Sequence, residues 1–289
     1  MNLPKITKKQ QEILNLLYRY RFLNRIQIQA LLRHKDYKTI NLWLKDLREK
    51  EYVTWIYSTH FAEKTKPAIY YLGLNGIRHL KQLTTTDEDG SEVPTHALDE
   101  LRKRYRESTR SQTFIDRCVL LADCCITLRQ QRAATTGYFY QTEADYLSEN
   151  SYYHFILDSE FMRPGLVFCK DKYDKQGEEE ATLESYLLEV FDSTLPRYRI
   201  KKRLGDYVKY LDDEDYEWKE QTDTEKLPIL LFVCPRTSDL IYAKRRTRKL
   251  IADAWEYKDD EEERPRVRFT TVDKLKQSSV LAKEIWEQA

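Results

Sequence analysis

Hydrophobic residues in the first third of the chain recur at helical spacing three times and then alternate. The spacing predicts helices from Ile6 to Tyr20, from Asn24 to about Leu32 and from about Tyr37 to Lys50. The alternation predicts a strand through Tyr52–Tyr57 and a returning strand over Ala68–Leu72. Three helices followed by a β-hairpin are typical of a winged helix-turn-helix, so residues 1–83 are predicted to form one.

The third predicted helix separates apolar from polar residues. On a helix of about 3.6 residues per turn, its apolar residues form one stripe, and Lys38, Asn41 and Lys45 lie on the opposite side. A recognition helix presents such a polar side to the major groove, where Asn41 would pair with adenine and the two lysines would reach phosphates or guanine. The alternative is an ordinary amphipathic helix whose lysines are only solvated.

The loop of the predicted hairpin carries two more cations. Lys64 and Lys66 are placed to contact phosphate or a minor groove if the hairpin acts as a wing. Exposed hairpin lysines also discourage pairing between strand edges, so this second explanation stays open for both residues.

Charge is divided unevenly along the chain. Residues 1–83 contain 16 Lys/Arg and 6 Asp/Glu, whereas residues 84–289 contain 33 and 42, although the overall formal charge is only +1. A small, strongly cationic module is expected to bind a polyanion such as duplex DNA, because neutralising phosphates releases counterions. The charge therefore favours DNA binding by residues 1–83.

Residues 84–95 have the polar composition of a linker, and a different pattern follows them. Residues 96–289 are predicted to begin with two helices, continue with strands and helices, and end with a helix. The predicted strands cover 138–142, 166–169, 186–191, 229–234 and 267–271. Helices that flank such strands indicate an α/β domain.

Composition excludes several classes of protein. No run of about 20 apolar residues is present, so we expect a soluble cytoplasmic protein with no membrane contact. The five cysteines show no paired CxxC spacing, and the five histidines are scattered. We therefore expect buried reduced thiols and neither a metal site nor another cofactor.

Three short motifs carry a family resemblance. They are Tyr70–Gly76 (YYLGLNG), Arg163–Phe168 (RPGLVF) and Leu187–Thr194 (LLEVFDST), the last followed by a basic helix. In order and spacing they resemble the replication-relaxation family, whose members join a winged helix to a domain similar to the PD-(D/E)xK nucleases. The resemblance implies an α+β chain with an N-terminal winged helix and an α/β restriction-endonuclease-like domain.

The nuclease reaction needs two carboxylates on adjacent strands to hold Mg²⁺, and usually a lysine near the attacking water. Glu189 matches the second acidic position, but Gly165 stands where the first is expected and Phe191 stands where the lysine is expected. We therefore expect no catalytic residues and a Glu189 that pairs with an Arg or Lys. The alternative is an Mg²⁺-dependent endonuclease in which Asp158 or Glu160 supplies the missing carboxylate and Lys201 or Lys202 supplies the lysine.

The resemblance also implies a role. We expect a DNA-binding protein of a plasmid or conjugative element that acts in replication, in transfer or in the transcriptional control of either. The expected partners are double-stranded DNA, replication or conjugation proteins, and a second copy of the chain in a homodimer. A transcriptional regulator whose second domain only senses or assembles is the remaining alternative.

Overall fold

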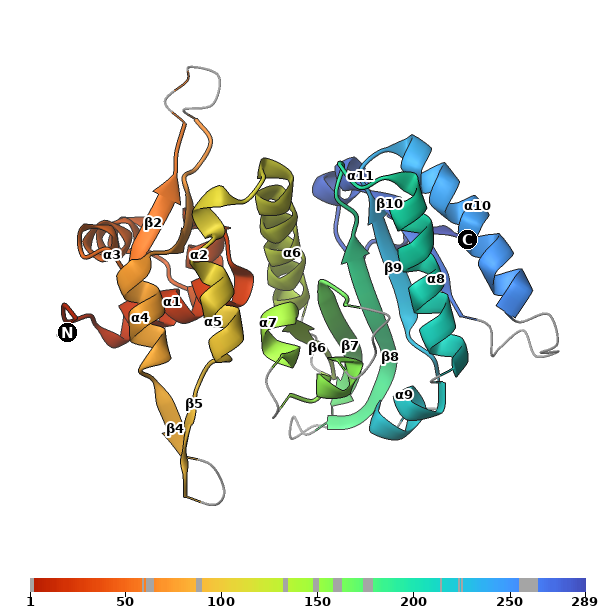
Figure 1. The fold of residues 1–289 in the computed structure, drawn as a ribbon, viewed down its shortest axis with the longest axis horizontal. Helices are drawn as coiled ribbons and strands as arrows, with labels where there is room; N and C mark the ends of the chain where they lie inside the picture. The colour runs from red at the N-terminus through yellow and green to blue at the C-terminus, as the bar shows by residue number, and fades with distance from the viewer. Residues whose placement is uncertain are drawn as a thin grey trace. The chain divides into compact units, whose positions relative to one another are not determined.

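The computed structural model describes residues 3–58, 60, 65–86, 90–131, 135–147, 151–157, 163–173, 179–213, 215–222, 224, 226–254 and 265–289. The fold is mixed α+β (Figure 1). The chain divides into two compact units, Met1–Ile126 and Thr127–Ala289.

Three helices open the first unit: α1 (Lys8–Tyr20), α2 (Arg25–Leu32) and α3 (Tyr37–Glu49). Thr7 caps α1 and Asn24 caps α2, and in each case the glutamine three residues later completes a capping box. Such boxes satisfy backbone N–H groups that a helix start leaves without partners. The three helices lie where the sequence predicts them.

A small antiparallel sheet joins these helices. Its strands β1 (Leu23–Asn24), β2 (Val53–Ile56) and β3 (Ile69–Leu72) lie in the order β1-β3-β2. The sequence predicts the two strands of the hairpin, and β1 is an addition to them. The buried apolar residues of the helices form the core of this part of the unit, and they include Ile13, Leu17, Ile28, Ile40, Leu44 and Leu47.

Helix α4 (Leu74–Lys81) begins in close contact with the end of α3, and two glycines permit this approach. A Cβ atom on Gly73 would lie 2.5 Å from the carbonyl oxygen of Glu51, and one on Gly76 would lie 2.2 Å from that of Tyr52. The amide of Asn75 donates to the carbonyl of Lys50 at 2.9 Å. These two close approaches explain why the segment after β3 carries two glycines.

Residues 84–95 are not an unstructured connection. Strands β4 (Thr84–Thr86) and β5 (Glu92–Pro94) pair as a hairpin, and α5 (Leu98–Arg104), a short 3-10 helix (Glu107–Thr109) and α6 (Gln112–Gln130) follow. Ile115 and Cys118 of α6 pack with Phe22 and Tyr71 in one buried cluster. Because these contacts join α6 to the first helices, the compact unit extends to Ile126, whereas composition alone places the boundary at 84–95.

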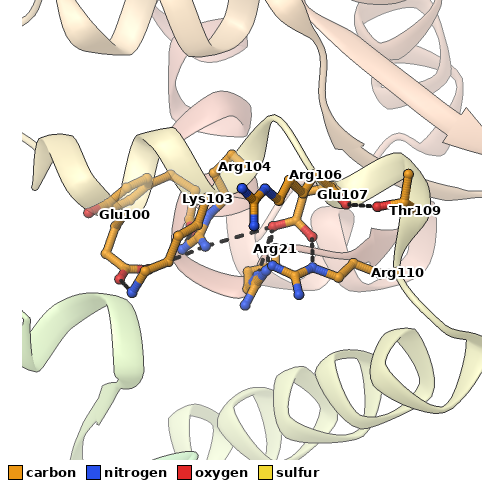
Figure 2. Close-up of polar contacts among 9 residues, drawn as sticks. Arg21, Glu100, Lys103, Arg104, Arg106, Glu107, Thr109 and Arg110 are labelled. Carbon is orange, nitrogen blue, oxygen red and sulfur yellow. Dashed lines mark hydrogen bonds and ion pairs between the residues drawn. The ribbon is translucent and has the colours of Figure 1, made fainter.

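A buried ion cluster holds the 3-10 helix against the end of α1. Glu107, only 1% exposed, lies 2.8 Å from Arg21 and 3.7 Å from both Arg104 and Arg110, measured between charged atoms (Figure 2). Arg104 is 2% exposed at its side chain and donates a further hydrogen bond to the carbonyl of Tyr18 at 3.2 Å. The cluster satisfies charges that burial would otherwise leave uncompensated.

The second unit is built on a six-stranded sheet in the order β11-β10-β9-β8-β7-β6. Strands β8, β9 and β10 are parallel to one another, and the other neighbours pair antiparallel. The sequence predicts the first five strands along the chain but not the last. The strands are β6 (Thr136–Thr142), β7 (Leu166–Tyr173), β8 (Glu179–Val190), β9 (Ile229–Cys234), β10 (Val267–Thr271) and β11 (Glu287–Gln288).

Helices α8 (Arg197–Asp213) and α10 (Thr237–Ala254) lie side by side on one face of this sheet (Figure 1). Their apolar residues, such as Leu204 and Leu240, enter one core with Phe232 and Phe269 of the sheet. Three shorter helices complete the unit: α7 (Glu143–Tyr146), α9 (Asp215–Thr222) and α11 (Val272–Gln277). Instead of ending in a helix, the chain passes through a short 3-10 turn (Lys283–Ile285) into β11.

Across the residues that the structure describes, none of the helices combines the length and the apolar character needed to cross a lipid bilayer.

Candidate nucleic-acid interface

The exposed side of α3 carries the three residues that the sequence singles out. Lys38, Asn41 and Lys45 are all exposed, whereas Ile40, Leu44 and Leu47 on the opposite side are buried. Asp36 caps the helix, and the hydrogen bonds from the Thr39 hydroxyl and the Lys38 backbone lower the pKa of its carboxyl group. The first turn is thus fixed, and the three side chains leave the same side of one rigid helix.

The surroundings of these residues leave the lysines accessible. Lys45 lies 3.8 Å from Glu49, but both side chains are more than half exposed. An exposed pair of this kind contributes little free energy and is readily exchanged for another partner. Lys66 of the hairpin loop is also exposed, and Lys64 lies outside the described residues.

Sequence reasoning missed a second part of this surface. The guanidinium of Arg48 on α3 lies 3.7 Å from the ring centroid of Trp55 on β2, and Trp55 stacks on Tyr57. Leu42, also on the exposed side of α3, is 66% exposed. The sequence does contain a sign of this surface. Val53, Trp55 and Tyr57 occupy every second position, so the two aromatic side chains lie on the same side of the extended chain as Val53 and continue beyond the core.

In the second unit, Glu189 lies near the end of β8 and is 1% exposed. Its carboxylate forms an ion pair with Arg203 of α8 and accepts a hydrogen bond from the hydroxyl of Tyr207 at 3.1 Å. Burial and the neighbouring Glu189 raise the pKa of Tyr207 well above its usual value, so the phenol keeps its proton and donates. Both carboxylate oxygens are therefore occupied by side chains of the same helix.

Among the residues that the structure describes, Gly165, Phe191 and Asp192 lie close to Glu189 along or beside β8. The backbone N–H of Gly165 donates to the carbonyl of Leu188 at 3.0 Å, which places the glycine beside the strand position of Glu189. Phe191 is buried and stacks on Phe232, with ring centroids 5.4 Å apart. Asp192 accepts hydrogen bonds from Thr194 in the turn that leads to α8.

Asp158, Glu160, Lys201 and Lys202 are the residues that would serve a relocated nuclease site. Asp158 and Glu160 lie outside the described residues, so their distance from Glu189 is not given by the structure. Lys201 and Lys202 are exposed on α8, and Lys202 lies 3.2 Å from Asp206. The nearest cation to the Glu189 carboxylate in the described chain is instead Arg203, one residue further along the helix.

Metal-binding side chains do not gather elsewhere in the described ranges, where no group of three or more His, Cys, Asp or Glu residues is arranged to hold an ion. All five cysteines are buried and none forms a disulfide bond, as predicted. Burial raises the pKa of Cys118 to about 11 and that of Cys124 and Cys234 to about 12. These thiols stay protonated near neutral pH and act as small apolar side chains.

Two stretches of cations on α8 and α10 are partly neutralised within the unit. Arg197 and Arg236 both contact the buried carboxylate of Asp239, at 3.7 and 2.8 Å. Lys244 pairs with Glu287 at 3.1 Å. The carboxylate that Arg197 and Arg236 share is buried, whereas the partner of Lys45 is exposed, so the cationic side of α3 is the stronger candidate for a nucleic-acid contact.

The sequence model of the family described as Replication-relaxation matches residues 14–227, a range that includes α3, β2 and Glu189. Neither the curated proteins nor the solved structures gave a match to the chain.

Proposed function

The chain belongs to the replication-relaxation family, and we propose that it is a double-stranded DNA-binding protein of a plasmid or conjugative element. Its role would lie in replication, in transfer or in the transcriptional control of these processes. Replication or conjugation proteins are the expected protein partners, and a homodimer is the expected assembly on a palindromic site.

One observation carries the proposal: α3 presents Lys38, Asn41 and Lys45 on its exposed side, opposite the residues that it buries in the core. Helices α1 to α3 and the antiparallel hairpin β2-β3 have the order and connections of a winged helix, in which α3 is the recognition helix. The lysines then neutralise phosphates, and the amide of Asn41 pairs with the N6 and N7 edge of an adenine.

We further propose that the second unit is a nuclease-like domain without catalysis. Divalent metal ions bind to carboxylate oxygens that are free to coordinate them. Both oxygens of Glu189 are engaged by Arg203 and Tyr207, and Gly165 beside it has no side chain. The guanidinium of Arg203 thus neutralises the carboxylate at the position where an active nuclease would bind Mg²⁺. The second unit would then contact DNA, a partner protein or a second copy of the chain.

Asn41→Ala tests the recognition role of α3. Duplexes that the intact chain binds are first selected from a random pool, and the affinity of both proteins is then measured on a selected and on a random duplex. Loss of a bidentate contact to adenine should weaken the selected complex by about 1–3 kcal/mol, roughly 5- to 150-fold. The random complex should change little, because Asn41 makes no contact there that depends on sequence.

Equal weakening on both duplexes would show that Asn41 does not recognise a base. Lys45→Ala serves as the matched control from the same helix, since loss of a phosphate contact should weaken both complexes alike.

Incubation with supercoiled plasmid in Mg²⁺ or Mn²⁺ tests the absence of catalysis. We expect neither nicked nor linear product from the intact chain, because the carboxylate of Glu189 is already neutralised. Product that depends on the metal and disappears in Glu189→Ala would establish an endonuclease with relocated carboxylates. Product that persists in Glu189→Ala would instead identify a contaminating nuclease.

A further inference from the structure

Two aromatic rings are exposed beside α3, Trp55 on β2 and Tyr57 immediately after it. Val53, Trp55 and Tyr57 occupy every second position, so in an extended chain their side chains lie on the same side. Val53 is 1% exposed in the core, but Trp55 is 40% exposed and Tyr57 is 45% exposed. The side of the strand that is apolar in the core therefore continues outward as an aromatic surface.

The two rings are held in a defined geometry. Their centroids are 5.6 Å apart and their planes differ by 21°, so they form a stack. Trp55 also contacts Tyr70 of β3, with ring centroids 6.1 Å apart, and Tyr70 is buried. The guanidinium of Arg48 lies over the Trp55 ring at 3.7 Å, within the range of a cation–π contact. These contacts hold the exposed rings in place before any ligand arrives.

Arg48 joins this aromatic stack to the cationic side of α3. It follows Lys45 by three residues and Asn41 by seven, so all three leave the same side of the helix. The aromatic rings thus border a row of cations rather than a neutral surface. An apolar protein partner would have to cover these charges, whereas a nucleic acid supplies bases for the rings and phosphates for the cations.

We infer that the Trp55–Tyr57 stack binds the bases of an unpaired DNA strand that adjoins the duplex held by α3. Bases within a duplex stack on one another and present only their edges, so an exposed ring can stack only on a base that has left the helix. The inference rests on the proposed function and deepens it. The preferred substrate becomes a duplex with a single-stranded extension, as occurs where DNA is partly melted.

The test compares two fluorescently labelled DNAs of the same duplex sequence, one blunt and one with a single-stranded extension of mixed sequence. For each protein the measured quantity is the ratio of the two dissociation constants. We expect the intact chain to bind the extended DNA about tenfold more tightly, since one or two stacked bases contribute an effect of that order. The extended DNA should also quench part of the tryptophan fluorescence.

Three variants separate stacking from general damage. Trp55→Ala should bring the ratio close to one, and Trp55→Phe, which keeps a ring, should retain most of the preference. Tyr198→Ala removes an aromatic side chain from α8 that is even more exposed than Trp55, and it should leave the ratio unchanged. Circular dichroism of each variant checks that the fold is kept.

The outcomes distinguish the two proposals. Binding of both DNAs with equal affinity by the intact chain would overturn this inference and leave the proposed function standing. A preference that survives in Trp55→Ala would also overturn it, because the extension would then be bound elsewhere. Failure to bind either DNA would overturn the proposed function itself, and the inference with it.

Discussion

Glu107→Ala is expected to destabilise the first unit by about 3–5 kcal/mol, the size of effect seen when one partner of a buried ion pair is removed. The carboxylate of Glu107 is the shared partner of Arg21, Arg104 and Arg110 (Figure 2). Arg104 is itself buried, so the substitution leaves a guanidinium with less compensation in a place that water does not reach. Thermal unfolding should show a midpoint lower by roughly 10–20 °C for a unit of this size.

Glu12→Ala is the matched control for that measurement. It also removes one glutamate that pairs with a cation, but Glu12 and Lys9 are both about half exposed. An exposed pair of this kind contributes no more than about 1 kcal/mol. If Glu107→Ala and Glu12→Ala shifted the midpoint equally, the cluster would not be what holds α1 to the 3-10 helix.

The double substitution Lys38→Ala and Lys45→Ala is expected to weaken duplex binding about 30-fold near physiological salt. Each phosphate contact contributes roughly a factor of five there through counterion release, and two contacts are lost. The slope of log affinity against log salt should fall by about 2 for the same reason. Fluorescence anisotropy over a salt series gives both quantities from one set of titrations.

The control removes the same charge from other helices of the same unit. Lys9 on α1 and Arg102 on α5 are exposed and each pairs with an acidic neighbour three residues away. The double variant Lys9→Ala and Arg102→Ala should change affinity only slightly, with nearly the same salt slope. An equal loss in both double variants would mean that total charge, and not the exposed side of α3, determines binding.

The helices of the first unit could be predicted because their local signals agree. Thr7 and Asn24 each stand three residues before a glutamine at the start of an apolar repeat, and each caps its helix in the structure. The strands β9 and β10 were also predicted with their observed bounds, since a short apolar run between polar turns allows few other structures. In these segments local sequence and tertiary packing favour the same conformation.

The boundary between the units could not be found in the same way. The composition of residues 84–95 is that of a linker, yet they pair as β4 and β5. What extends the first unit is long-range: Gln27 of α2 donates to the carbonyl of Val119 at 2.9 Å and to Asp123 at 2.7 Å on α6. Hydrogen bonds between residues more than 90 positions apart leave no periodic signal in the sequence.

The candidate site was partly predictable. Helical geometry places Lys38, Asn41 and Lys45 on the exposed side of α3, and the structure has them there. Helical geometry alone could not predict that Arg48 lies over Trp55, because that contact depends on how β2 packs against α3. The motif around Glu189 predicts that this carboxylate pairs with an Arg or Lys. The sequence could not identify its partners, Arg203 and Tyr207, because they depend on how α8 packs on the sheet.

The most direct test of the account is a titration of the intact chain into a labelled duplex at about 50 mM and again at about 200 mM salt. If α3 meets the phosphate backbone through its cations, the chain retains the duplex at the lower salt and releases much of it at the higher. A chain that fails to retain the duplex even at the lower salt would contradict the claim that this helix binds DNA.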